Sequence, residues 1–338
     1  MQSMARGKWF PSLTSGSPQA RAAAVAVRAR AATVDLFLRR LGRQPGKDPE
    51  DVHQLRVATR RLVAALSVFK PLLDPKLRRE LRRCARRLRR LAGDVRDLDV
   101  HRAMLDSRRQ ALDEFAAVAL RRGFDTTARR AQRDLVRVLP RWSVRFRRAA
   151  RALVDSIGSP RLAHGDARTL GTMADQVIQV RLDDLRAAGR GDLSDLDRLH
   201  RLRIAAKRLR YAMELFAACY RRAFRDDLYT RVESLQEALG EINDLRNLAD
   251  RVAELGDRAS HKRRRDRHDA LRTATRSLQA LLLHELNERR TRFQARWQPA
   301  DQARLRRQFR QMQRTRASRR SPRARRKPAA LGRAEVEL

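Results

Sequence analysis

Apolar residues recur along most of the chain at intervals of three and four, and no segment shows the alternation typical of a surface strand. This spacing places apolar side chains along one side of an α-helix. It predicts helices over ten ranges, which are 18–41, 49–71, 75–92, 94–121, 125–154, 166–189, 193–219, 221–239, 241–256 and 264–290. The pattern therefore predicts an all-α fold.

Segments that contain glycine and proline separate the predicted helices. SIGSP at 156–160 lies near the middle of the chain, and Gly93 and Gly240 each interrupt a helical pattern. Because both residue types disfavour a helix interior, we expect breaks at these positions. Residues 1–17 are rich in Ser, Pro and Gly and are expected to be flexible, and the like-charged run at 313–338 is expected to be disordered.

Two pairs of segments match at one offset of 147 residues, from 53 to 200 and from 93 to 240. HQLRVATRRLVAALSVF begins at His53 and matches HRLRIAAKRLRYAMELF from His200, while GDVRDL from Gly93 matches GEINDL from Gly240. Two separate matches at one offset predict a tandem duplication of a helical unit. The predicted organisation is a first repeat at 18–155, a linker at 156–165 and a second repeat at 166–300.

The repeated helix has one apolar side and one basic side. At about 100° per residue, Leu55 and Leu62 fall on one side, whereas His53, Arg56 and Arg60 follow one another on the other. The second copy carries basic residues at the matching positions, which are His200, Arg203 and Lys207. We expect each copy to build the core with one face and to present a row of cations with the other.

The charge of the chain indicates which kind of partner this basic face binds. The sequence has 79 Lys and Arg against 39 Asp and Glu, a net charge of +40, and no acidic residue occurs from His53 to Lys70. An excess of this size attracts anions at long range, which indicates nucleic acid, an anionic membrane or a soluble polyanion as partner. The helix that follows each repeated helix adds candidate phosphate-binding arginines, which are Arg78, Arg82, Arg86, Arg222 and Arg225.

These motifs resemble those of the CHAD domain, the conserved-histidine α-helical domain. The resemblance rests on VHQLRVATRRLVAAL and LHRLRIAAKRLRYAM, each with a leading His, and on the GxxxDL segments, and it covers roughly residues 20–300. It implies two pseudo-symmetric antiparallel four-helix bundles, whose His-led helices line a shared basic cavity that binds inorganic polyphosphate. The binding residues carried over by motif match are His53, Arg56, Arg60, Arg61, His200, Arg203, Lys207, Arg208 and Arg210.

The resemblance also bears on location, because members of the family are often associated with polyphosphate granules. The N-terminal residues lack the apolar run of a signal peptide, and no stretch approaches the 18 uncharged apolar residues of a membrane span. We therefore expect a cytoplasmic protein that associates with polyphosphate granules and does not insert into a membrane. The sequence leaves the oligomeric state open.

No arrangement of residues predicts catalysis. The chain has no Gly-rich phosphate loop and no GxSxG, and HELNE at His284 lacks the second His of a zinc-protease motif. Asp97 and Asp244 are expected in the first turns of helices that begin after Gly93 and Gly240, where a carboxylate complements the helix dipole, or beside an arginine that they support. We expect a non-catalytic protein without a cofactor or a metal.

Two alternative functions remain open. The same charge could serve nonspecific nucleic-acid binding, although no nucleic-acid-binding motif is present and Trp9, Trp142 and Trp297 are scattered along the chain. The exposed helices could also serve as a scaffold that tethers storage granules.

Overall fold

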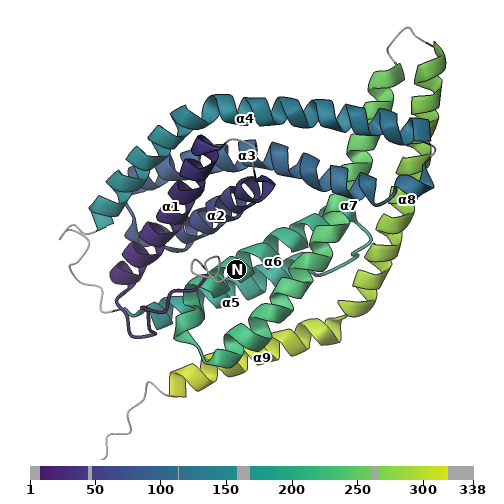
Figure 1. Ribbon diagram of the computed structural model, residues 1–338. Coiled ribbons are helices and arrows are strands. Elements are labelled where there is room, and N and C mark those ends of the chain that lie inside the picture. The colour runs from purple at the N-terminus through teal and green to yellow at the C-terminus, as the bar shows by residue number, and fades with distance from the viewer. Residues whose placement is uncertain (1–7, 45–47, 113, 158–167, 261–264, 319–338) are drawn as a thin grey trace, which may run out of the picture.

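The computed structural model describes residues 8–44, 48–112, 114–157, 168–260 and 265–318, and within these ranges every named element is a helix (Figure 1). The main helices of the first half are α1 (Gln19–Arg43), α2 (Pro49–Val68), α3 (Pro75–Asp106) and α4 (Glu114–Ile157). Those of the second half are α5 (Leu170–Ala188), α6 (Leu196–Phe216), α7 (Thr230–Ser260), α8 (Arg265–Arg296) and α9 (Pro299–Ser318). The all-α prediction is confirmed.

Short helical turns connect several of these helices. They are the 3₁₀ turns η2 (Lys70–Leu72), η3 (Arg109–Ala111) and η5 (Ala217–Cys219), and the π-helix η6 (Phe224–Tyr229). The turn η2 follows α2 and η5 follows α6, so the ends of the two repeated helices have the same local structure. Shifting the bounds of α2 by the offset of 147 residues gives 196–215, against Leu196–Phe216 for α6. This agreement supports the predicted duplication.

Aspartate caps begin both repeated helices. The Asp48 carboxylate accepts a hydrogen bond from the amide of Glu50 at 2.8 Å, and Pro49 occupies the first turn of α2. The Asp195 carboxylate accepts from the amide of Asp197 at 2.8 Å at the start of α6. Such caps satisfy amides that the first helical turn leaves without partners, so they fix where each basic face begins.

Each repeated helix buries the apolar side that the sequence predicts. Leu55, Leu62 and Phe69 of the first copy are fully buried. Phe216, the counterpart of Phe69, is also fully buried, and the two rings meet with their centroids 6.4 Å apart. One hydrophobic core therefore extends across both halves.

The helices of each half pack in sequence order. In the first half α1 packs on α2, α2 on α3 and α3 on α4, and α4 also returns to α1. In the second half α5 packs on α6, α6 on α7 and α7 on α8, and α5 packs on α9. The helices α2 and α6 contact each other between the halves, and Figure 1 shows the α1–α2 pair beside the α5–α6 pair. This contact brings the two basic faces together.

The predicted helix breaks at Gly93 and Gly240 are wrong. Both residues lie inside continuous helices, Gly93 in α3 and Gly240 in α7. The apolar spacing runs through Gly93, where Val95 and Leu98 are buried, so packing outweighs the weak helix preference of glycine. The chain breaks instead around η3, within the helix predicted over 94–121.

The chain ends also differ from the expectation. Within residues 8–17, predicted to be flexible, Phe10 and Leu13 are buried, and the Leu170 amide donates to the Ser17 carbonyl at 2.8 Å. Apolar contacts and pairing with the start of α5 thus hold this segment in place. The helix α9 continues to Ser318, so the predicted tail begins inside a helix, and residues 319–338 lie outside the described residues.

Two further predictions bear on the described part of the chain. The linker was predicted at residues 156–165. Residues 156 and 157 are the last two of α4, and residues 158–165 lie outside the described residues. Among the described helices, none combines the length and the apolar character that a membrane span requires.

Candidate anion-binding site

The two predicted rows of cations meet where α2 packs on α6. The charges that act most strongly on Lys207 of α6 belong to four arginines from three helices. We call these five residues the basic cluster, and its members are Arg56 and Arg60 of α2, Arg89 of α3, and Arg203 and Lys207 of α6. All five are half-buried. Residues far apart in sequence therefore form one concentrated site of positive charge.

Burial and mutual repulsion govern the protonation of this cluster. Burial lowers the pKa of Lys207 to about 7, and repulsion by Arg60 and Arg203 acts in the same direction. The pKa of Arg60 is lowered by burial and by the neighbouring Arg56 and Arg203, although Arg60 remains charged at neutral pH. Like charges held together away from water are unfavourable, so an anion placed among them would relieve the repulsion.

Two aspartates compensate part of this charge. Asp97 of α3 forms an ion pair with Arg56, whose Nη1 also donates to the Gly93 carbonyl at 3.5 Å. Asp244 of α7, the counterpart of Asp97 in the second repeat, attracts Arg203 and so opposes the lowering of the pKa of Arg203 by burial. Both aspartates lie in helix interiors, so the predicted helix-dipole role is wrong, and the alternative of a supporting contact to an arginine is confirmed for Asp97.

A row of arginines on α3 extends the basic cluster. Burial lowers the pKa of Arg82, and the neighbours Arg86 and Arg78 lower it further. Burial likewise lowers the pKa of Arg89, followed by repulsion from Arg86 and Arg56. The row from Arg78 to Arg89 spans about 16 Å at the helical rise per residue. It forms a continuous track of positive charge that ends in the basic cluster.

Hydrogen-bonding capacity remains along this track. The buried Nε atoms of Arg78 and Arg82 have no hydrogen-bond partner within the described structure. The sequence prediction had included Arg78, Arg82 and Arg86 but missed Arg89. The available signal was the spacing, because Arg89 continues the row one helical turn after Arg86.

The two leading histidines have different surroundings. His53 is half-buried, and its pKa is lowered first by burial and then by Arg96, so in the absence of an anion it is neutral at pH 7. Its Nδ1 is buried and has no hydrogen-bond partner in the described structure. His200 is exposed, and its Nδ1 lies 3.0 Å from Oδ1 of Asn243. Arg56 and Arg60 of the basic cluster act electrostatically on His53.

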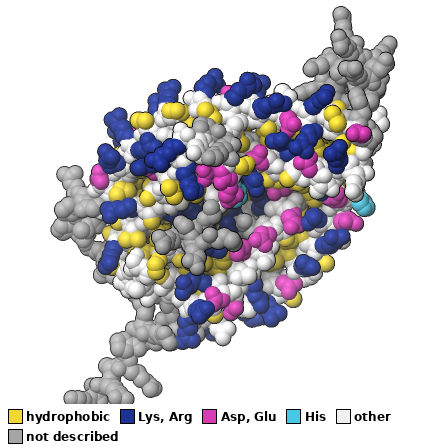
Figure 2. Space-filling model, in the orientation of Figure 1, with side chains coloured by type: hydrophobic (Ala, Val, Ile, Leu, Met, Phe, Trp, Pro, Cys, Tyr) yellow, Lys and Arg dark blue, Asp and Glu magenta, His cyan; other side chains and the backbone are white. Residues whose placement is uncertain are grey.

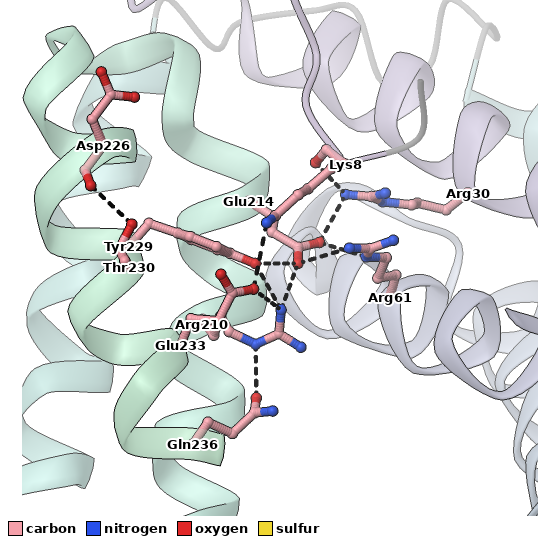
Figure 3. A network of polar contacts seen from close by, with 10 residues as sticks. All are labelled: Lys8, Arg30, Arg61, Arg210, Glu214, Asp226, Tyr229, Thr230, Glu233 and Gln236. Carbon is pink, nitrogen blue, oxygen red and sulfur yellow. Dashed lines mark hydrogen bonds and ion pairs between the residues drawn. The ribbon is translucent and has the colours of Figure 1, made fainter. Parts of the chain in front are cut away.

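Arg61 and Arg210 belong to a second cluster, around the buried carboxylate of Glu214 (Figure 3). Arg61 donates to both Glu214 oxygens, at 2.7 and 3.2 Å, and Arg30 and Arg210 each donate to one at 3.3 Å. The Tyr229 hydroxyl donates to Oε1 of Glu214 at 3.1 Å. We call these five residues the Glu214 network. It joins α1 and α2 to α6 and η6, so the structure gives these arginines a role in linking the two halves.

Three other predicted residues lie at the surface. Arg208, Arg222 and Arg225 are exposed, and Arg222 pairs with Asp226 at 2.9 Å. Arg222 and Arg225 line a surface hollow of about 740 Å³, and Trp9 lines it too. Figure 2 shows the molecule in the orientation of Figure 1, and basic side chains cover much of this face, with acidic side chains among them. Exposure and nearby carboxylates distinguish these arginines from the half-buried basic cluster.

A cavity of about 750 Å³ lies next to the site, between α3, α4 and α7. Both signs of charge line it, with Asp94, Asp97 and Glu254 among its acidic residues and Arg87 and Arg130 among its basic ones. The carboxylates would repel a polyanion, so this cavity differs from the predicted basic one. Within the described residues, no group of three or more His, Cys, Asp or Glu side chains is placed to hold a metal ion.

Comparison with protein families decides the classification. A family model described as the CHAD domain matches residues 26–253, well over half of the chain. The chain belongs to the CHAD domain family. All five residues of the basic cluster fall within the matched range, whereas α8 and α9 lie beyond it.

Solved structures share this CHAD fold. The crystal structure of the CHAD domain from the plant Ricinus communis is 24% identical, with a TM-score of 0.66, and the match covers 88% of this chain and 93% of that one. PptA from Streptomyces chartreusis is also 24% identical, with a TM-score of 0.62 and coverage of 83% and 99%. No curated protein matches the sequence. At this identity the structural likeness establishes the fold.

Proposed function

We propose that this CHAD domain binds inorganic polyphosphate, without catalysis, at the basic cluster and along the arginine row of α3. The observation that carries the proposal is the arrangement around Lys207, where cations from three helices converge and are half-buried. Family membership supports the same partner, because the CHAD motifs imply polyphosphate binding. Association with polyphosphate granules in the cytoplasm would follow from binding the polymer.

The chemistry of the ligand fits the shape of the site. A guanidinium group donates two parallel hydrogen bonds to paired phosphate oxygens and stays charged at physiological pH. Polyphosphate is a linear chain with a negative charge on each phosphate, so it can contact a track of cations about 16 Å long without any requirement for a base or a sugar. Binding should weaken steeply with salt, since counterions are released from the polymer.

The site that we propose is smaller than the set of residues predicted from the sequence. The residues that we assign to it are His53, Arg56, Arg60, Arg78, Arg82, Arg86, Arg89, Arg203 and Lys207. Arg61 and Arg210 are left out because their guanidinium groups serve the Glu214 network. Arg208, Arg222, Arg225 and His200 are left out because they are exposed and belong neither to the basic cluster nor to the arginine row of α3.

The double substitution Arg60→Gln with Arg203→Gln tests the site. Both side chains are half-buried in the basic cluster, so we expect at least a tenfold loss of affinity for long-chain polyphosphate at about 150 mM salt. Arg208→Gln with Arg222→Gln removes the same charge from exposed positions and is the matched control. Equal loss in the two variants would mean that net charge, rather than the basic cluster, binds the polymer.

Nucleic acid is the second candidate partner, because α9 carries an exposed basic row. Arg304, Arg307, Arg310 and Arg314 are all exposed and recur at intervals of three and four residues. Such a row can contact the backbone of a duplex without reading its sequence. Competition between long-chain polyphosphate and duplex DNA of equal total charge separates the candidates. Stronger binding of DNA would overturn the polyphosphate proposal.

A further inference from the structure

A hollow of about 460 Å³ lies between α7, α8 and α9, and it shares no lining residue with the basic cluster. Figure 1 shows that the chain turns sharply from α8 into α9. Most of the lining residues lie on these two helices, beyond the range that the family model matches. The volume falls within the roughly 300–1,000 Å³ that is typical of small-molecule sites. The hollow is therefore a candidate ligand site separate from the proposed polyphosphate site.

The floor of this hollow is apolar. Leu235 of α7, Phe293 of α8 and Leu305 of α9 all line it and are buried. The Phe293 ring stacks on that of Trp297, with the centroids 6.4 Å apart, and Ala238 of α7 contributes only a methyl group. Apart from the indole nitrogen of Trp297, these side chains have no hydrogen-bonding group. The floor therefore suits the apolar body of a ligand rather than a bare phosphate chain.

Arginines line the hollow together with this apolar floor, and they are Arg231, Arg289, Arg292, Arg296 and Arg304. Three of them have partners on the protein, in the pairs Arg289–Glu241, Arg292–Glu288 and Arg231–Gln308. Arg296 and Arg304 are exposed, and within the described structure they have neither a hydrogen bond nor an ion pair. The other lining carboxylate, Asp301, lies in the first turn of α9, where it complements the helix dipole. Two guanidinium groups are thus available to an anion.

We propose that this hollow binds a free amphipathic anion, which is a molecule with an aliphatic chain and a carboxylate head. The chain lies on Leu235, Phe293 and Leu305, and the head accepts hydrogen bonds from Arg296 and Arg304. Burial of the chain supplies most of the affinity, and the two guanidinium groups set the direction in which the ligand lies. The ligand class follows from the combination of an apolar floor with unpaired arginines, because neither feature alone would select it.

A free ligand fits this hollow better than a membrane surface does. Docking on a membrane requires apolar side chains that project from the protein, whereas the apolar residues that line the hollow are buried or half-buried. The large exposed apolar residues of the described chain lie elsewhere, and none of them lines the hollow. They are Leu36, Val118, Val136, Val144, Val180 and Leu283. The hollow thus suits one aliphatic chain that enters it.

The first test measures the binding of decanoate to the full chain by isothermal titration calorimetry. We expect one site per chain, and tighter binding of decanoate than of octanoate, because each buried methylene group raises affinity by about fourfold. The fluorescence of Trp297 should report the same binding, since Trp9 and Trp142 do not line the hollow. In Trp297→Phe the calorimetric signal should remain and the fluorescence change should be lost. The absence of saturable binding would overturn the proposal.

The second test changes the hollow itself. Ala238→Trp fills it, and we expect a loss of decanoate affinity of about tenfold or more. Arg296→Gln with Arg304→Gln removes the free guanidinium groups and should cost about fivefold or more. Arg208→Gln with Arg222→Gln removes the same charge elsewhere and should have no effect. Equal losses in the two double variants, or full affinity in a folded Ala238→Trp, would overturn the proposal.

The double variants keep the test decisive if Ala238→Trp does not fold, because Arg296 and Arg304 are exposed and their replacement leaves the core intact. Circular dichroism checks the helix content of each variant. Vesicles of phosphatidylglycerol provide the membrane arm. Sedimentation with these vesicles that is lost in Arg296→Gln with Arg304→Gln, without saturable binding of decanoate, would assign the hollow to a membrane and overturn the proposal.

This proposal does not depend on polyphosphate binding. The variant Arg60→Gln with Arg203→Gln should bind decanoate as the unmodified chain does, because neither residue lines the hollow. A loss of decanoate affinity in this variant would place the ligand at the basic cluster and overturn the proposal. The variant Arg296→Gln with Arg304→Gln should in turn keep its affinity for long-chain polyphosphate if the basic cluster binds the polymer. Failure of one site would thus leave the other unaffected.

Discussion

At the scale of single residues, the structure assigns basic side chains to two different environments. The basic cluster holds cations that face mainly other cations, whereas the Glu214 network surrounds one buried carboxylate with Arg30, Arg61 and Arg210. The first arrangement is unfavourable without an anion, and the second is compensated internally. Substitutions in the two environments should therefore affect different properties, binding in one case and stability in the other.

The amine of Lys207 should make polyphosphate binding depend on pH. Its pKa of about 7 in the free protein would rise when an anion binds, since nearby negative charge favours the ammonium form. Binding then takes up a proton, so affinity should fall as pH rises from 7 to 9, by up to tenfold per unit. Titration of polyphosphate at several pH values measures this dependence. In Lys207→Arg the charge is permanent, and a slope as steep as that of the unmodified chain would exclude Lys207 as its source.

The carboxylate of Glu214 should be important for stability. It is 1% exposed and accepts hydrogen bonds from three guanidinium groups, so Glu214→Gln leaves buried cations without a counter-charge. We expect a loss of about 3–5 kcal/mol in the free energy of unfolding, measured by urea denaturation. Glu233→Gln is the control, because that side chain is partly exposed and accepts from Arg210 at 3.4 Å. Its loss should be about 1 kcal/mol or less, and equal losses would contradict the special role of Glu214.

At the scale of elements, the continuity of α3 and α7 positions the site. Because α3 runs without a break through Gly93, the arginine row and Asp97 share one rigid helix and approach α2 in a fixed register. The helix α7 places Asp244 near Arg203 in the corresponding way. A break at Gly93 would have separated the arginine row of α3 from Asp97.

The interior glycines of these two helices should be replaceable. A Cβ atom added at Gly93 or Gly240 would meet no atom within 4 Å, and alanine favours the helix by about 0.5–1 kcal/mol. We expect Gly93→Ala and Gly240→Ala each to raise the free energy of unfolding by about this amount in thermal or urea denaturation. Gly256→Ala is the contrasting control, since its Cβ would lie 2.7 Å from Oγ1 of Thr275. Destabilisation by the first two changes would show that the glycines have a role beyond helix continuity.

At the scale of the whole molecule, the contact between α2 and α6 makes two repeats into one structure. The Phe69–Phe216 contact lies in the shared core, and the Glu214 network spans the same interface. The basic cluster takes its cations from both halves, so neither half contains the complete site. Binding and stability thus depend on the same interface.

This interface predicts that the two halves unfold together. Helix content followed by circular dichroism and the fluorescence of Trp9, Trp142 and Trp297, which lie in different parts of the fold, should give coincident urea transitions. Saturating polyphosphate should move both transitions to higher urea concentration together, because the ligand binds the native state. Two separate transitions, or a shift of only one, would indicate that the halves fold independently.

Much of this architecture could be predicted from spacing along the chain. The intervals between Leu55, Leu62 and Phe69 predicted the buried side of α2, and the matching intervals from His200 predicted that of α6. Helix boundaries were harder to predict, because Gly93 is a weak signal that the packing of its neighbours outweighs. Arg89 was missed since its charge alone does not distinguish it from the other arginines of α3.

The sequence by itself determined the helices, the offset between the repeats and the side of each repeated helix that carries charge, because these depend on neighbours within two or three turns. Only the tertiary structure decided which charges meet. It brought the charge of Arg60 to bear on Lys207 and paired Arg61 with Glu214, and the members of each pair lie far apart along the chain. The physical reason is that such contacts depend on how α2 packs against α6, and local spacing carries no information about that packing.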